Sequence, residues 1–279
     1  NVNVWSCENT DVEMVVKKLN SVGRFRNSFE LIYGNGTKML VSDELMLDSV
    51  IQLLHGSKDG MPEPFEFVKI LTYLDKSDSP IVKENIMMVE LLFYNYIRHD
   101  VNLRHFQLFY GILHNPSTML ELIKLAWLPD NEQAKEIRKN EFAKNKNLSS
   151  IAKIALEILH GLEAQPCENN NGVVNGQDLK KYAKELLEAA KSEYLERPAM
   201  YVIGKLLGNI NLGEDYPPPY LGEILEELDK DEIDDEYRRQ LFNRHGFTCR
   251  AYNEGGTIER KREKKFLSYA EKTRFTYDR

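Results

Sequence analysis

The sequence predicts an all-α fold, an irregular stack of helical hairpins that is either solenoid-like or two-lobed. Apolar residues recur at intervals of three and four along most of the chain, as on the buried face of an amphipathic helix. Glycine, proline and asparagine separate these segments and mark turns. Apart from possible short pairings near the glycines, no segment alternates apolar and polar residues as a β-strand does. The hairpins follow no fixed sequence period, so both architectures stay open.

Three helices are predicted between residues 11 and 56. Apolar side chains have helical spacing before and after the break at Gly23, so we expect two antiparallel helices there. Gly34-Asn35-Gly36 is a strong turn signal that ends this pair. Ser42 then opens a third helix that reaches about Leu54.

The middle of the chain contains the longest of the apolar-rich predicted helices. Pro64 lies at the start of one helix, where proline is tolerated because the first N–H groups have no partner. The next helix, residues 81–97, has apolar residues on more than one face, and we expect it to be central and heavily buried. Asn115-Pro116-Ser117 separates two further helices. The aromatic residues of this region have helical spacing, and we interpret them as core residues: Phe93, Tyr94, Tyr96, Phe106, Phe109 and Tyr110.

A polar break divides the chain. Residues 130–147 carry mixed charges and few apolar side chains, which indicates an exposed arm or a poorly packed linker, and residues 151–162 are again helical in pattern. Glu168-Asn169-Asn170-Asn171-Gly172 cannot bury apolar surface and marks the best internal boundary. We therefore expect an N-terminal helical lobe over residues 1–167 and a C-terminal helical lobe over residues 168–279.

The C-terminal lobe is predicted to begin with a helix that Asn175 caps and whose first turn carries the favourable charge of Asp178. Further helices are expected over residues 198–207, 220–228 and 233–242, and from Thr257 onward. A loop rich in arginine and glycine, residues 242–260, leads into the last of them.

Composition narrows the class of protein. The chain has 279 residues, of which 42% are hydrophobic, enough for a real core. The net charge of −7 argues against a generic nucleic-acid binder, which is usually basic. Cys7, Cys167 and Cys249 form neither a disulfide framework nor a Cys-x-x-Cys metal pair, which is typical of the reducing cytoplasm.

The ends of the chain and its apolar runs bear on location. No apolar run is long enough to cross a membrane, and the N-terminus lacks a signal-peptide pattern, so we expect a cytoplasmic protein without membrane contact. The chain starts at Asn1 without methionine, and its last amphipathic segment stops abruptly at Arg279. We therefore expect a fragment of a longer protein.

The densest polar segment, residues 242–260, is the predicted binding site. Loops on a rigid scaffold often carry function, and arginine side chains suit phosphate or carboxylate groups next to a helix N-terminus. The candidate ligand- or partner-binding residues are Arg244, His245, Arg250, Glu254, Glu259 and Arg260. The alternative is a polar network that only holds the loop to its own helices, with Cys249 as an inert buried thiol.

Three segments point to a family resemblance. Residues 86–96, 108–130 and 243–260 are similar to the C-terminal helical region of long, multidomain bacterial proteins of uncharacterised function. The most specific matches are Asn243, Gly246, Arg250, Glu254, Gly255, Gly256, Glu259 and Arg260. Arg244-His245 departs from the family pattern, which has a small residue followed by arginine. The resemblance implies a bacterial source and a module that follows effector or other domains, but no activity; a place in phage defence follows only by analogy of architecture.

Two opposite charge blocks lie near the end of the chain. Residues 223–236 contain nine acidic residues and one lysine, whereas residues 244–279 contain ten basic and five acidic residues. We interpret the blocks as attracting each other within the chain, and the alternative is a basic surface for nucleic acid or an acidic partner. Glu259 and Glu263 interrupt the basic run, which weakens a continuous phosphate-binding stripe.

The histidines have simple structural explanations. His99 and His105 lack a third metal ligand at a defined spacing, so we expect solvated side chains. His55, His114 and His160 each fall near a predicted helix C-terminus, where an imidazolium interacts favourably with the helix dipole.

These observations predict a non-enzymatic helical scaffold or sensing module for protein–protein interaction within a larger bacterial protein. The sequence has no Gly-rich phosphate loop, His-Glu-x-x-His motif or nucleophile elbow, so we expect no catalytic residues, no metal and no cofactor. The expected partner is a protein or another domain of the same chain. Two alternatives stay open: a nucleic-acid or anion-binding module that uses the basic C-terminal loop and helix, and an enzyme with an unrecognised site around residues 243–260.

Overall fold

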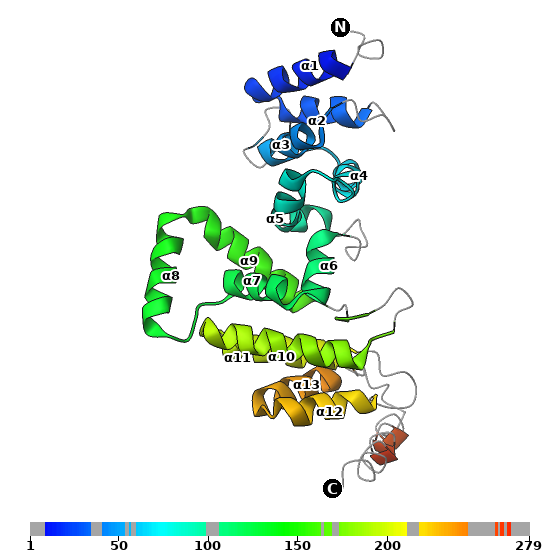
Figure 1. Cartoon of the computed structure of the whole chain (residues 1–279), viewed down its shortest axis with the longest axis vertical. Coiled ribbons are helices and arrows are strands. Elements are labelled where there is room, and N and C mark those ends of the chain that lie inside the picture. Colours follow the sequence, from blue (N-terminus) through cyan, green and yellow to red (C-terminus); the bar gives the residue numbers. More distant parts are fainter. Residues whose placement is uncertain are drawn as a thin grey trace, which may run out of the picture.

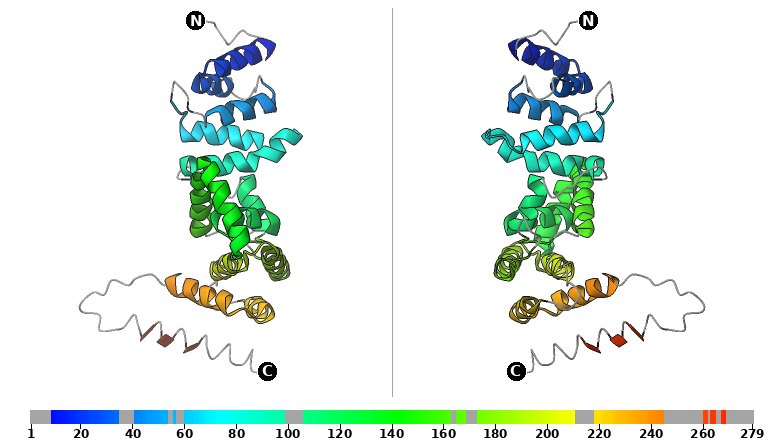
Figure 2. Two further views of the ribbon diagram at one scale, coloured as in Figure 1. Left: turned by 90° about the vertical axis from the view of Figure 1, so that its left-hand side faces the viewer. Right: turned by 90° about the vertical axis from the view of Figure 1, so that its right-hand side faces the viewer.

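The computed structural model describes residues 9–34, 41–53, 56, 60–98, 106–162, 165–168, 173–210, 218–244, 260–261, 263–264 and 267–268. Thirteen α-helices dominate this described part, and the predicted all-α fold is confirmed. The helices follow one another along the longest axis of the molecule (Figure 1), and side views show most of them lying across that axis in successive layers (Figure 2). The only β pairing among the described residues is an isolated antiparallel bridge between Glu168 and Val174.

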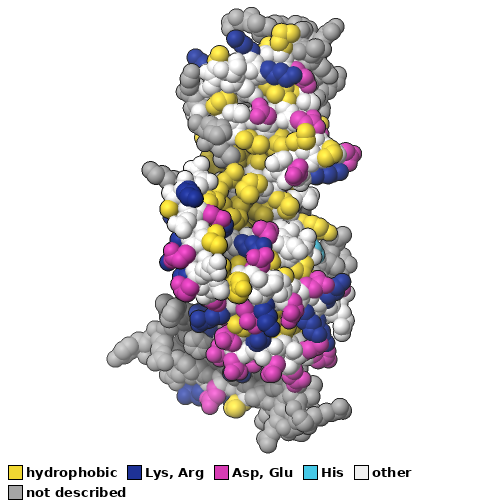
Figure 3. Space-filling model, turned by 60° about the vertical axis from the view of Figure 1, so that its left-hand side comes forward, with side chains coloured by type: hydrophobic (Ala, Val, Ile, Leu, Met, Phe, Trp, Pro, Cys, Tyr) yellow, Lys and Arg dark blue, Asp and Glu magenta, His cyan; other side chains and the backbone are white. Residues whose placement is uncertain are grey.

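Five helices build the first half of the stack: α1 (Asn9–Ser21), α2 (Phe25–Gly34), α3 (Asp43–Leu53), α4 (Pro64–Leu74) and α5 (Pro80–Ile97). The ends of these helices agree with the breaks that the sequence predicts. Gly23 has a φ of 74°, in the left-handed region that favours glycine, and Pro64 is the first residue of α4. Apolar side chains stay exposed on α4 and α5, among them Phe65, Ile81 and Met88. Figure 3 shows apolar side chains gathered over the middle of one face of the molecule.

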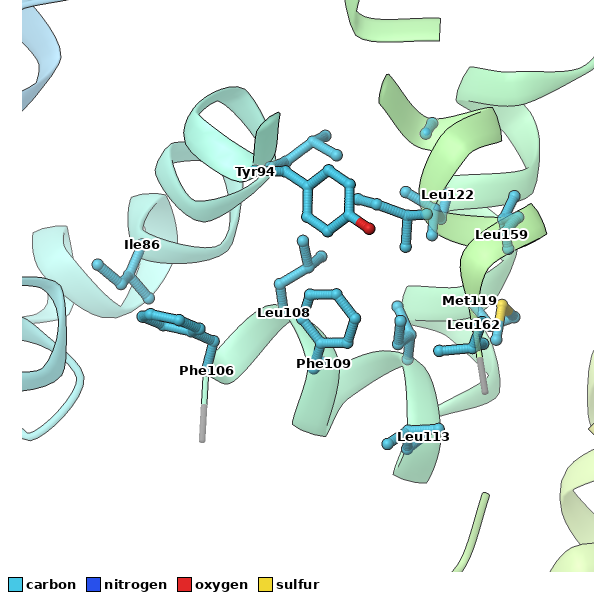
Figure 4. Close-up of a cluster of buried hydrophobic side chains, with 14 of the residues drawn as sticks. Ile86, Tyr94, Phe106, Leu108, Phe109, Leu113, Met119, Leu122, Leu159 and Leu162 are labelled. Atoms are coloured by element: carbon cyan, nitrogen blue, oxygen red, sulfur yellow. The ribbon is translucent and has the colours of Figure 1, made fainter. Parts of the chain in front are cut away.

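The core of the middle region forms around α5, as predicted. This helix packs against α6 (Gln107–His114) and α9 (Lys146–Gly161), and α7 (Pro116–Ala126) packs against both of those. Figure 4 shows side chains from the four helices gathered in one cluster, in which Phe106 and Met119 are almost fully buried. Tight packing of this kind fixes the angles between neighbouring helices.

The aromatic prediction is confirmed for Phe93, Tyr94, Phe106 and Phe109, which are buried, and Tyr96 is half-buried. It is wrong for Tyr110. That side chain is 59% exposed and lies beside His114 on the outer face of α6, with 4.5 Å between the ring centroids. Helical spacing alone cannot tell which of two adjacent aromatic positions faces the core.

The segment 130–147 contains the predicted exposed arm. Helix α8 (Glu132–Lys144) has no buried residue and stands at the side of the stack (Figure 1). The alternative of a linker is wrong, because the segment is a regular helix with a cap and an anchor. Asn131 accepts a hydrogen bond from the N–H of Ala134 at 3.0 Å, and Arg138 donates to the carbonyl oxygen of Lys124 at 2.9 Å.

Hydrogen bonds and packing connect the two sides of the predicted boundary at residue 168. Helix α10 (Gly176–Ser192) packs against α7. The hydroxyl of Tyr182 donates to the carbonyl oxygen of Ile112, near the C-terminus of α6, and the backbone N–H of Asn175 donates to the carbonyl oxygen of Cys167 at 3.3 Å. Buried apolar residues on both sides belong to one core cluster. The division into lobes 1–167 and 168–279 stays a prediction.

Asn175 caps α10 as predicted, and its side-chain oxygen accepts hydrogen bonds from the N–H groups of Gln177 (3.0 Å) and Asp178 (3.4 Å). Asn175→Ala should lower the free energy of unfolding by about 1 kcal/mol, because these N–H groups lose their partner. Chemical denaturation measures this loss. Asn175→Asp retains the acceptor and should stay close to wild type; an equal loss in both variants would contradict the capping role.

The last described helices are α11 (Glu196–Gly208), α12 (Pro219–Leu228) and α13 (Asp231–Arg244), and the α11–α13 pair packs more extensively than any other pair in the described part. Gly204 and Gly208 make this close approach possible. A Cβ on Gly204 would lie 2.7 Å from both the Cβ of Glu236 and the carbonyl oxygen of Ile233, and a Cβ on Gly208 would collide with Gln240. Residues four apart share one helix face, so α13 lies directly against the backbone of α11.

Glu90 of α5 places a carboxyl group in the core. It is 2% exposed, and its two oxygens accept hydrogen bonds from the N–H groups of Gln107 (3.2 Å) and Leu108 (2.6 Å) at the start of α6. Both carboxyl oxygens of Asp75, directly after α4, are buried, and no N–H or hydroxyl group of the described residues donates to them. Burial, followed by the charge of Asp75, raises the pKa of Glu90 to about 9. This raised pKa indicates that Glu90 keeps a proton at neutral pH, and a hydrogen bond from that proton to Asp75 is consistent with the shifts of both groups.

Candidate functional site

The structure describes little of the binding site that the sequence predicts. The backbone of Arg244 ends α13, and Arg260 is exposed in a short helical segment. His245, Arg250, Glu254 and Glu259 lie outside the described residues, as does Cys249. The predicted network of these side chains therefore stays a prediction, and the described residues present a different candidate.

That candidate is an open groove of about 810 Å³, which we call the aromatic groove. It is formed by the α7–α8 connection together with α9, α11 and α13, segments that are far apart in the sequence. Its lining residues are Trp127, Leu128, Asp130, His160, Arg197, Pro198, Tyr201, Glu232, Asp235, Glu236 and Arg239. A concave site that collects aromatic and charged groups from several helices is the usual form of a ligand- or peptide-binding site.

Three rings form one wall of the aromatic groove. The ring centroids of Trp127, His160 and Tyr201 lie 5.9–6.3 Å apart in each pair, and the ring planes are tilted by 62–68°. This edge-to-face geometry is the favoured arrangement of aromatic pairs. Trp127 and Tyr201 are half-buried and His160 is exposed, so the wall offers ring surface to a ligand while its base is packed.

Backbone contacts fix the positions of these rings. The buried Lys205 of α11, 8% exposed, donates from Nζ to the carbonyl oxygen of His160, and Asn209 Nδ2 donates to that of Leu162 at 2.7 Å. Both bonds pair carbonyl oxygens at the C-terminus of α9 that have no partner within the helix. The helix dipole also favours a cation at this end. The backbone N–H of Trp127 donates to the carbonyl oxygen of Ile123 at 3.0 Å, and α7 ends there. These bonds fix the backbone at Trp127 and at His160.

Another part of the groove lining comes from α13. Glu236 is 6% exposed and forms an ion pair with Arg239, and its other oxygen accepts a hydrogen bond from Gln240 Nε2 at 2.6 Å. The guanidinium of Arg239 lies 5.5 Å from the centroid of the Tyr201 ring, a cation–π contact. Burial, followed by the charge of Glu236, raises the pKa of Tyr201, so its hydroxyl keeps its proton at neutral pH. The groove thus already holds one guanidinium between an aromatic face and a carboxylate.

The rim of the aromatic groove is acidic. The side chains of Asp130, Glu232 and Asp235 are exposed and form no ion pair or hydrogen bond with the described residues. Arg197 offsets one of these negative charges, because the charge of the other lining arginine, Arg239, is already neutralised by Glu236. The groove therefore has a net charge of about −2 at neutral pH.

Sequence reasoning missed this site. Trp127 and Tyr201 lie in ordinary helical patterns, and His160 is explained by its helix C-terminus, which the structure confirms. One feature of the sequence does indicate part of this site. The spacing Gly204-x-x-x-Gly208 inside a helix indicates a close helix partner, and that partner is α13, which carries Glu236 and Arg239.

Two other kinds of site are absent from the described residues. No group of three or more His, Cys, Asp or Glu side chains among them is arranged to hold a metal ion, and no described helix is long and apolar enough to cross a membrane. Comparison of the chain with protein-family models, curated proteins and solved structures finds no match. The resemblance to bacterial multidomain proteins therefore stays an expectation.

Proposed function

We propose that this chain is a non-enzymatic helical scaffold or sensing module that binds a protein partner within a larger bacterial protein. The observation that carries the proposal is the aromatic groove, in which rings from the end of α7, from α9 and from α11 pack against one another and form one wall. Tryptophan and tyrosine dominate binding energy at protein interfaces because they bury a large area with few rotatable bonds. The exposed apolar side chains on α4 and α5 give the stack a second surface suited to protein contact.

The chemistry of the groove favours binding over catalysis. The carboxylate of Glu236 is already occupied by Arg239 and Gln240. The pKa of Tyr201 is raised, which moves its hydroxyl further from acting as a base or nucleophile at neutral pH. In the α6–α10 region, burial raises the pKa of the Cys167 thiol to about 11, so it is not an activated nucleophile either. These residues support a scaffold more than the enzyme alternative.

Selection of peptides from a random library displayed on phage tests the proposal. We expect peptides that bind the wild-type chain and lose about tenfold or more of their affinity on Trp127→Ala, the loss typical of an interface hot spot. His160→Ala should also weaken binding, and because this ring is exposed the variant should fold normally. Tyr110→Ala removes an exposed aromatic ring outside the groove and should leave affinity unchanged. Peptides that bind all four proteins equally would place the docking site elsewhere.

A further inference from the structure

We propose that the aromatic groove takes a cationic side chain, an arginine or a lysine, from a basic segment of the partner protein. This inference rests on the proposed function of the groove and specifies its ligand. It follows from three features of the described residues: the charge of the rim, the aromatic wall, and an internal contact that already has the required geometry.

The charge of the rim selects a cation. Asp130 comes from the α7–α8 connection, whereas Glu232 and Asp235 come from the first turns of α13, so two separate segments supply carboxylates to the groove. An acidic segment would meet three negative side chains and only Arg197 as a counter-charge. A basic segment would be attracted by the three carboxylates and repelled by Arg197 alone. Complementary charge both steers association and rejects wrong partners.

The aromatic wall supplies the second half of a cation site. The ring of tryptophan is the strongest cation–π acceptor among side chains, and Trp127 lies in the same groove as the acidic rim. A guanidinium or ammonium group placed on this ring would lie in the groove that Asp130 also lines. Arginine suits this arrangement best, because its planar group stacks on a ring and still donates to a carboxylate.

The internal contact shows that this arrangement fits the groove. Arg239 is held over the ring of Tyr201 while its Nη2 contacts the carboxylate of Glu236. The proposed ligand repeats the same three-part contact, with Trp127 as the ring and the rim as the carboxylate. The chain's own basic residues Arg260, Lys261 and Lys264, which are exposed, are the competing occupant and become one arm of the test.

Fluorescence anisotropy with defined probes tests the inference. Three labelled Gly-Ser peptides of equal length carry arginine, lysine or glutamate at the same positions. We expect the arginine and lysine peptides to bind and the glutamate peptide not to bind. The double variant Glu232→Gln/Asp235→Asn should weaken binding about five- to tenfold and reduce its salt dependence, as expected for two exposed charge pairs.

The matched control removes the same charge from the same acidic block outside the groove. Glu223 and Glu226 are exposed on α12 and do not line the groove, so Glu223→Gln/Glu226→Gln should retain the affinity of wild type. An equal loss in this control would mean general attraction and would overturn the inference. So would tighter binding of the arginine peptide when Arg260, Lys261 and Lys264 are changed to glutamine and binding to the Glu223→Gln/Glu226→Gln control is unchanged, because the basic residues of the wild-type chain would then be shown to occupy its own groove.

The outcome also separates this inference from the function on which it rests. If selected peptides bind at Trp127 but carry no excess of arginine or lysine and tolerate the loss of Glu232 and Asp235, the cation site is wrong and the docking groove stands. If selection yields no peptide that depends on Trp127 and the basic probes do not bind, both proposals fail.

Discussion

Gly204→Ala should destabilise the protein by about 1–3 kcal/mol, although alanine is the better helix former. The added Cβ would lie 2.7 Å from the backbone carbonyl oxygen of Ile233 and from the Cβ of Glu236, and neither atom is the end of a flexible side chain. The clash must therefore move α13 away from α11. Urea denaturation measures the loss of stability, and amide hydrogen exchange should accelerate in α11 and α13 before it changes in α5.

A second glycine provides the control for this prediction. Gly161 also lies in a helix, but a Cβ there would meet only the hydroxyl of Tyr94 at an ordinary 3.8 Å. Gly161→Ala should therefore be neutral or slightly stabilising. Gly204→Ala should also weaken peptide binding, because α13 carries Glu236 and Arg239 into the aromatic groove. Equal stability of the two variants would show that α11 and α13 tolerate a wider separation.

The helices could be predicted from the sequence because their ends depend on local chemistry. Asn175 caps its helix with its own side chain, and Pro64 favours a helix start through its own backbone geometry. Neither effect depends on residues far away in the chain. It was harder to predict which side of each helix faces the core. Tyr110 has the same spacing as its buried neighbours, and only the position of α5 and α7 around α6 decides that it faces solvent.

The aromatic groove could not be predicted, because it exists only after distant helices pack. Trp127, His160 and Tyr201 are separated by more than thirty residues in each step, and each one alone has a sufficient structural explanation. Contacts across such distances leave no periodic signal in one sequence. Residues 245–259 show the converse: their composition is conspicuous, but they lie outside the described residues, so their role stays a prediction.

The stability of the protein should fall as the pH rises from about 5 to about 8.5, with Glu90 as the responsible group. Its pKa is raised to about 9 in the folded chain, above the ordinary value of 4.5, so the folded state binds this proton more tightly than the unfolded state. The contribution of Glu90 is therefore most favourable below the unfolded pKa and is lost as the pH rises toward the folded one. The slope from one such group is at most about 1.4 kcal/mol per pH unit. Urea denaturation across this pH range measures it.

Asp75→Asn should flatten this slope, because it removes the neighbouring charge and supplies an amide that can donate to an ionised Glu90. From the lower to the upper end of the range, the stability of this variant relative to wild type should rise by about 1 kcal/mol or more. Other titrating groups act equally in both proteins, so the difference between the two slopes isolates the Asp75–Glu90 pair. Glu84→Gln changes an exposed carboxyl group on the same helix and should keep the wild-type slope. If Asp75→Asn and Glu84→Gln both retain that slope, the pH dependence arises outside the pair, and Glu90 serves only to cap the start of α6.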